Sequence, residues 1–73
     1  MARIEIESDV TGTVWKIEVE EGSKVTEGQT LIILESMKME IPIEAPFDSE
    51  IEEIFIKKDE VISQNQPLLT LKS

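Results

Sequence analysis

The residues best placed to do chemistry lie in one short stretch, ESMKME, at positions 35–40. At its centre, Lys38 offers a primary amine between Met37 and Met39. A lysine amine is a nucleophile once it has lost its proton, and methionine is an adaptable apolar side chain that suits contacts with other proteins. The pattern is that of a lysine displayed to a modifying enzyme.

Other reactive groups are scarce in this chain. It has no Cys and no His, which excludes disulfides and metal sites built from thiolates or imidazoles. The sequence contains no nucleophile elbow and no phosphate-binding loop. Because 16 of the 73 residues are Asp or Glu, paired carboxylates arise by chance. We therefore expect no metal site, no catalytic residue and no enzyme activity of its own.

Length and charge further restrict the class of protein to which this chain can belong. A chain of 73 residues is long enough for one small domain, residues 1–73. The net charge of −9 repels nucleic acid and anionic lipid. No apolar run reaches membrane-spanning length and no leader pattern is present, so the expected location is the cytoplasm. Eleven Ile and five Val favour strands over helices.

The sequence repeats itself at a spacing of 37 residues, with halves at about 12–34 and 49–71. Turn glycines at 22 and 28 fall on Asp59 and Asn65, the residue types most tolerant of positive φ after glycine. Residues 50–62 alone could form an amphipathic helix. Their counterpart alternates as a strand and is cut by Gly22, so we interpret both segments as strands.

The expected elements follow from the repeat. Strands are predicted near 3–7, 12–20, 30–36, 39–45, 49–57 and 67–72, with short extended pieces near 24–26 and 61–63. Turns are predicted at 22–23, 27–28, 46–48 and 65–67. Two copies of a four-strand unit favour an all-β sandwich or flattened barrel with a pseudo-twofold axis. Trp15 is expected in its core.

The hydrophobic pattern also fixes one hairpin, residues 30–45. If Met37 and Lys38 form its two-residue turn, Leu34 faces Ile41, and the next inward pair, Ile32 and Ile43, lies on the same face. A shift by one residue would place Ile against Glu. The turn departs from the Asn-Gly preference of such hairpins, and Glu35 opposes Glu40. Local rules broken at one place often mark a functional site.

These residues resemble the biotinyl/lipoyl attachment family, and Met-Lys-Met between two repeats is similar to its biotinyl, biotin carboxyl carrier-like branch. The resemblance implies two four-stranded antiparallel sheets, a barrel-sandwich hybrid. It also implies biotin in amide linkage to Lys38, contacts from Met37 and Met39, and recognition of the hairpin through Glu35, Ser36 and Glu40. Residues 12–28 run without insertion, so the chain is similar to members that lack the thumb loop.

The resemblance implies a carrier that moves a carboxyl group between a biotin carboxylase and a carboxyltransferase after loading by a biotin protein ligase. We expect a monomer, either a free-standing carrier or an excised domain. One alternative is a lipoyl carrier of a 2-oxo acid dehydrogenase complex or a dual attachment protein, although lipoyl domains usually have Asp-Lys-Ala at the turn. Another is an interaction module whose Lys38 stays unmodified.

Overall fold

The computed structural model describes residues 3–73, and its regular elements within that range are all strands. The eight strands are β1 (Arg3–Glu7), β2 (Gly12–Ile17), β3 (Lys24–Val25), β4 (Thr30–Ser36), β5 (Met39–Glu44), β6 (Ser49–Ile54), β7 (Val61–Ile62) and β8 (Pro67–Lys72). Residues 3–73 contain no helix that could cross a membrane. The all-β prediction is confirmed, and the helical alternative for residues 50–62 is wrong.

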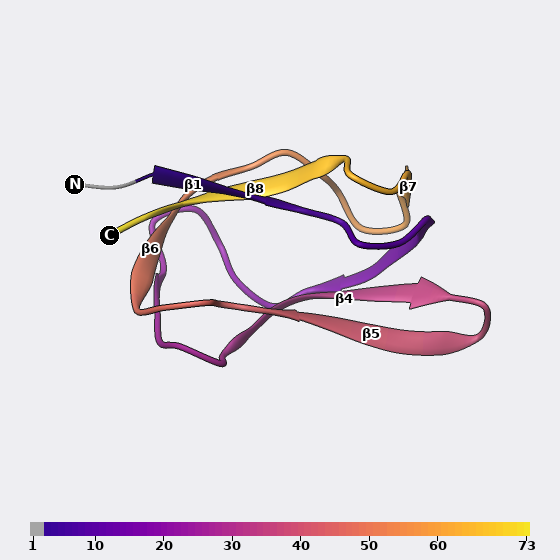
Figure 1. The fold of residues 1–73 in the computed structure, drawn as a ribbon, viewed down its shortest axis with the longest axis horizontal. Coiled ribbons are helices and arrows are strands. Elements are labelled where there is room, and N and C mark those ends of the chain that lie inside the picture. The colour runs from indigo at the N-terminus through magenta and orange to yellow at the C-terminus, as the bar shows by residue number, and fades with distance from the viewer. Residues whose placement is uncertain (1–2) are drawn as a thin grey trace.

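The strands form two four-stranded sheets that lie face to face (Figure 1). One sheet has the order β1-β8-β6-β3 and the other β5-β4-β2-β7, and every neighbouring pair is antiparallel. We call these the terminal sheet and the hairpin sheet. The core between them is aliphatic, and its fully buried members include Val14, Leu31, Ile32, Leu34, Ile51, Ile62, Leu68, Leu69 and Leu71. The sandwich predicted from the repeat is confirmed.

The 37-residue repeat relates one sheet to the other. Adding 37 carries β1 onto β5, β2 onto β6, β3 onto β7 and β4 onto β8, so the strand order of one sheet becomes that of the other. Backbone hydrogen bonds repeat as well: the N–H of Ser8 donates to the Gln66 carbonyl at 3.0 Å, and that of Ala45 to the Gln29 carbonyl at 2.9 Å. The expected pseudo-twofold is therefore built into the backbone.

The four turn positions singled out by the repeat all have positive φ. The angles are 89° at Gly22, 84° at Gly28, 72° at Asp59 and 70° at Asn65. Asp and Asn tolerate this left-handed region better than other side chains, which explains why they replace the glycines in the second half.

Two predicted strands are too long. β2 ends at Ile17 rather than 20, and β6 ends at Ile54 rather than 57. Directly after each of these ends, one more backbone hydrogen bond joins the chain to the neighbouring strand. In the first repeat it runs from the N–H of Glu18 to the Leu31 carbonyl at 2.9 Å. Val19 and Ile56 remain buried, so the hydrophobic alternation continues past the end of the hydrogen-bonded ladder.

The prediction that Trp15 belongs to the core is wrong, because its side chain is 43% exposed. The register between β2 and β4 shifts between Val14 and Lys16, which leaves Trp15 as the extra residue of a β-bulge. A bulge turns consecutive side chains away from strict alternation. Here Val14 is fully buried, and the next two residues both face solvent.

The molecule is elongated, with principal extents of 36 × 18 × 17 Å. The connection from β4 to β5 lies at one end of the long axis, and the start of β1 and the C-terminus lie at the opposite end (Figure 1). The hairpin turn is thus an isolated tip, distant from the start of β1 and from the C-terminus.

Candidate functional site

The tip is a two-residue turn made of Met37 and Lys38. Their φ angles are 52° and 64°, so both residues are left-handed, as the common tight hairpin turn requires. This conformation costs a side-chain-bearing residue about 1–2 kcal/mol. The predicted turn residues are confirmed, and the tip holds two non-glycine residues in a conformation that they do not favour.

Packing of the hairpin overrides this cost. The register pairs Leu34 with Ile41 and Ile32 with Ile43, as predicted. Leu34 and Ile32 are fully buried, and their two partners pack against the core. Because strand side chains alternate between faces, a one-residue slip would expose this entire apolar set. The turn residues are therefore fixed by the strands on either side of them.

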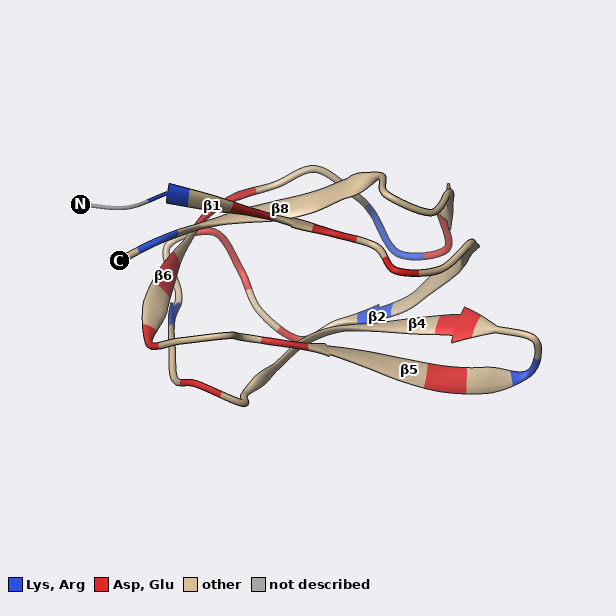
Figure 2. Ribbon diagram, viewed as in Figure 1, with Lys and Arg blue, Asp and Glu red and all other residues tan. Residues whose placement is uncertain are grey.

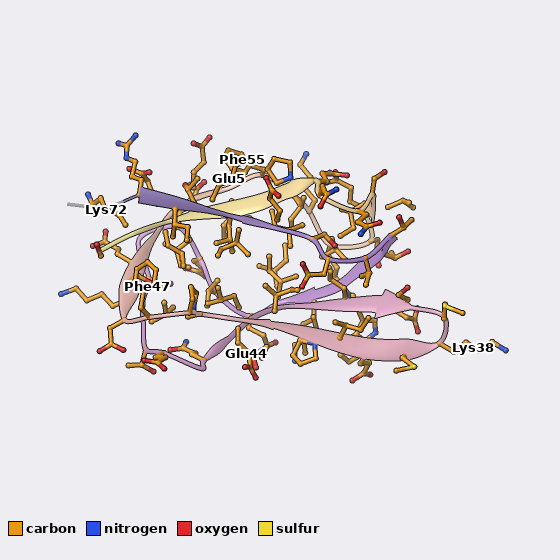
Figure 3. All side chains as sticks on the ribbon, in the orientation of Figure 1. Glu5, Lys38, Glu44, Phe47, Phe55 and Lys72 are labelled. Atoms are coloured by element: carbon orange, nitrogen blue, oxygen red, sulfur yellow. The ribbon has the colours of Figure 1, made fainter. Side chains whose placement is uncertain are left out.

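The Lys38 side chain extends from the tip, away from both sheets (Figure 3). It takes part in neither of the two ion pairs found within residues 3–73, which join Arg3 to Glu52 and Lys16 to Glu18. Its neighbours Met37 and Met39 are 91% and 64% exposed. The tip thus offers a free-standing amine between two apolar side chains that are open to contact.

Two carboxylates lie on the strands next to the turn that bears Lys38. Glu35 and Glu40 pair across β4 and β5, and both are exposed. Neither has a cationic partner among the ion pairs of the described chain. Figure 2 shows the two acidic positions on neighbouring strands next to the basic tip. Like charges placed opposite one another destabilise a strand pair, so this pair has no evident role in folding.

The end of β4 next to the turn is anchored by the segment that leads into β2. The hydroxyl of Ser36 donates a hydrogen bond to the Thr11 carbonyl oxygen at 2.9 Å. A Cβ at Gly12 would collide with the Glu35 carbonyl oxygen, so only glycine allows β2 this close to the end of β4. The sequence did not predict Thr11 and Gly12 as supports. The one signal was a glycine where the second repeat has Ser49.

The surroundings of the tip fit a covalently held group. Two open cavities in the described chain, of about 330 and 320 Å³, are lined by residues other than 35–40. One of them is lined in part by Lys24 and Lys72, and the other by Glu5 and Phe55. An exposed amine without an ion pair suits an amide bond, and a group held that way needs no pocket on this chain.

Comparison with known proteins agrees with this geometry. A family model described as "Biotin-requiring enzyme" matches residues 5–71. A Bacillus subtilis "Biotin/lipoyl attachment protein" is 38% identical over 64 residues, which is 88% of both chains. Pyruvate carboxylase of Bacillus subtilis is 39% identical over 67 residues, covering 92% of this chain but 6% of the carboxylase.

A solved single-chain, multi-domain long-chain acyl-CoA carboxylase contains the same fold. Its TM-score is 0.92 at 26% sequence identity, and the match covers 96% of this chain and 7% of that one. The chain thus spans nearly the whole of a small attachment protein and a small fraction of the carboxylases. On the extent of the family match and on these relatives, the chain belongs to the biotin/lipoyl attachment family.

Proposed function

We propose that this chain is a biotin carboxyl carrier, a single attachment domain of residues 1–73 in which Lys38 holds biotin in amide linkage. The observation that carries the proposal is the tip itself, a strained turn that presents one exposed amine between Met37 and Met39. The match to the biotin-requiring family supports biotin as the attached group. The named relatives, among them a biotin carboxyl carrier protein, support the carrier role.

The chain's own part in this function is to bind, present and position. A biotin protein ligase would convert biotin and ATP into biotinyl adenylate and supply the base that removes a proton from Nζ of Lys38. Nζ then attacks the acyl carbon, the bond from that carbon to the phosphate oxygen breaks, and AMP leaves as the amide forms. Bound biotin supplies a ureido nitrogen that can carry a carboxyl group. Attachment removes one positive charge, so the net charge falls from −9 to −10.

The hairpin fixes the base of the arm, and the lysine methylenes give the arm its reach. A rigid support on strands holds a functional group more accurately than a loop does. Tethering raises the local concentration of the carried group at both active sites that it visits. These would be a biotin carboxylase and a carboxyltransferase, and the relatives include pyruvate, urea and methylcrotonoyl-CoA carboxylases.

The remaining tip residues have proposed roles in recognition. Met37 and Met39 offer adaptable apolar contacts to the ligase and to the two carboxylase active sites. Glu35 and Glu40 offer a pair of unneutralised carboxylates, and Ser36, hydrogen-bonded to Thr11 next to the turn, is the third proposed recognition residue of this group. We propose that the domain is a non-catalytic monomer that works in the cytoplasm.

A lipoyl carrier is the second candidate, because the Bacillus subtilis relative is named for both groups. The test is to incubate the purified chain with biotin protein ligase, ATP and biotin, or with lipoate ligase, ATP and lipoate. Intact mass is then measured for the wild type and for Lys38→Arg. One biotinyl group on the wild type only is the expected result. A lipoyl group instead would favour the second candidate, and no gain with either ligase would refute both.

A further inference from the structure

The outer face of the hairpin sheet carries an apolar patch that the core does not use. It consists of Trp15, Ile33 and Pro42, and we call it the outer patch. Ile33 pairs with Pro42 on one side and with Lys16 on the other, next to the Trp15 bulge. Because Ile32 and Leu34 point inward, the residue between them points outward. Trp15 and Pro42 are exposed, and Ile33 is half-buried.

The internal repeat shows that the fold does not require this patch. The positions 37 residues away from its members are Glu52, Thr70 and Glu5. The terminal sheet has a bulge at the equivalent position, because the register of β6 and β8 shifts between Ile51 and Glu53. There the bulged Glu52 forms an ion pair with Arg3 at 2.8 Å. At these three positions the same backbone thus carries polar residues on one sheet and apolar residues on the sheet that bears Lys38.

The rim of the outer patch is acidic. Glu35, Glu40 and Glu44 alternate with Ile33 and Pro42 along β4 and β5, so they project from the same face. Figure 3 shows Glu44 pointing away from the molecule below the hairpin. Within residues 3–73, none of the three glutamates forms an ion pair. Lys16, a cation on this face, is paired with Glu18 at 3.3 Å.

An apolar centre with an acidic rim selects one kind of occupant. A second copy of this chain would bring two surfaces of like charge together, and nucleic acid or anionic lipid would be repelled. The face fits a protein surface that has an apolar pocket and basic side chains around it. Tryptophan is among the residues that most often dominate such contacts.

The position of the patch relative to the tip points to a partner that acts on Lys38. Ile33 precedes Lys38 by five residues along the hairpin, roughly 16 Å of strand, which one protein interface can span. The carboxylase active sites can recognise biotin itself. The ligase meets the chain before biotin is attached, so it must distinguish Lys38 from Lys72 and the other lysines by protein surface alone.

We propose that the outer patch is the surface on which the biotin protein ligase docks while Lys38 enters its active site. The inference rests on the proposed function and adds a binding surface to it.

The test uses the residues that the repeat itself provides. Trp15→Glu and Pro42→Glu place the counterpart residues, Glu52 and Glu5, in the patch. Phe55 directly follows β6, has the same 43% exposure as Trp15 and lines a cavity together with Glu5 (Figure 3). Phe55→Glu, which copies its counterpart Glu18, is therefore the matched control.

Steady-state kinetics of loading are measured for each variant with purified ligase, ATP and biotin, after thermal unfolding has confirmed the fold. We expect KM for the chain to rise about tenfold in Trp15→Glu and several-fold in Pro42→Glu, with kcat within about twofold. Phe55→Glu should keep the wild-type KM. A KM for Trp15→Glu and Pro42→Glu that equals that of Phe55→Glu would overturn the docking surface while leaving Lys38 as the attachment residue.

A second measurement keeps the proposal testable if a patch variant folds poorly. Lys38→Arg, which cannot be loaded, is labelled with ¹⁵N and titrated with ligase in the presence of biotin and ATP. The amide signals of β2, β4 and β5 should broaden or shift, and those of β6 and β8 should not. Perturbation confined to the tip, or spread equally over both sheets, would overturn the docking surface. Failure of the wild type to accept biotin would refute the carrier function together with this inference.

Discussion

The two ends of the molecule are built alike and carry opposite charges. At the hairpin end, Glu35 pairs with Glu40 beside the Met37–Lys38 turn. At the terminal end, the equivalent pair is Lys72 with Arg3, at the end of β8 and the start of β1. Arg3 is neutralised by Glu52, whereas the two glutamates have no ion pair within the described chain.

This difference separates what the fold needs from what the tip needs. The antiparallel register is the same at both ends, so neither pair of charges is required to set it. Within residues 3–73, the equivalent position at the terminal end has neither a left-handed Met-Lys turn nor an opposed pair of acids. Features absent from the equivalent backbone position are the ones to which we assign function.

The largest expected effect is on attachment itself. Lys38→Arg keeps the positive charge and the turn but removes the nucleophile, so loading with biotin should be lost completely. Lys72→Arg, the matched change at the other end, should load as the wild type does. Both are measured by intact mass after treatment with ligase. Residual biotin on Lys38→Arg would mean that another lysine is used.

The next largest effect is on stability where β2 approaches the end of β4, close to the turn. Gly12→Ala forces a methyl group against the Glu35 carbonyl, so the free energy of unfolding should fall by about 1–3 kcal/mol. Its counterpart Ser49 already carries a side chain, whose hydroxyl donates to the Phe47 carbonyl at 3.1 Å. Ser49→Ala should therefore cost less than about 1 kcal/mol. Urea denaturation measures both, and equal losses would contradict the close approach of β2 to β4.

A moderate effect is expected from exchanging charge between the ends. Glu35→Lys gives the hairpin the residue found at position 72, and loading by the ligase should slow about tenfold if the acids are recognised. The free energy of unfolding should change by less than about 0.5 kcal/mol, because the site is exposed. Lys72→Glu should load normally. Slower loading that is independent of salt concentration would argue against an electrostatic role.

The smallest effect should come from relieving the turn. Asn tolerates positive φ better than Met, so Met37→Asn should raise the free energy of unfolding by about 0.5–1 kcal/mol. It should also weaken recognition by removing an apolar contact. The reverse change, Asn65→Met at φ 70°, should lower stability by a similar amount without affecting loading. Thermal unfolding and loading rates are compared, and a less stable Met37→Asn would show that the turn is not strained.

The sequence predicted the hairpin register because a slip by one residue would be costly: in β5 it would replace Ile41 and Ile43 on the core face with a Glu or a Pro. It predicted the positive-φ turns because Asp59 and Asn65 replace glycines at equivalent positions. The prediction for Trp15 was wrong because a bulge changes the face of the sheet on which a side chain lies, and the hydrophobic pattern does not reveal the bulge. It missed Gly12 and Thr11 as supports because their contacts join β4 to a segment more than 20 residues away, which local pattern does not record.

The most direct test of the account is to map the modified residue. The wild-type chain is loaded by biotin protein ligase, cut with a protease that does not require lysine, and sequenced by tandem mass spectrometry. We predict biotin on Lys38 alone, with Lys72 at the opposite end of the molecule unmodified. Biotin on Lys72 or on several surface lysines, or a chain that a competent ligase leaves unmodified, would contradict it.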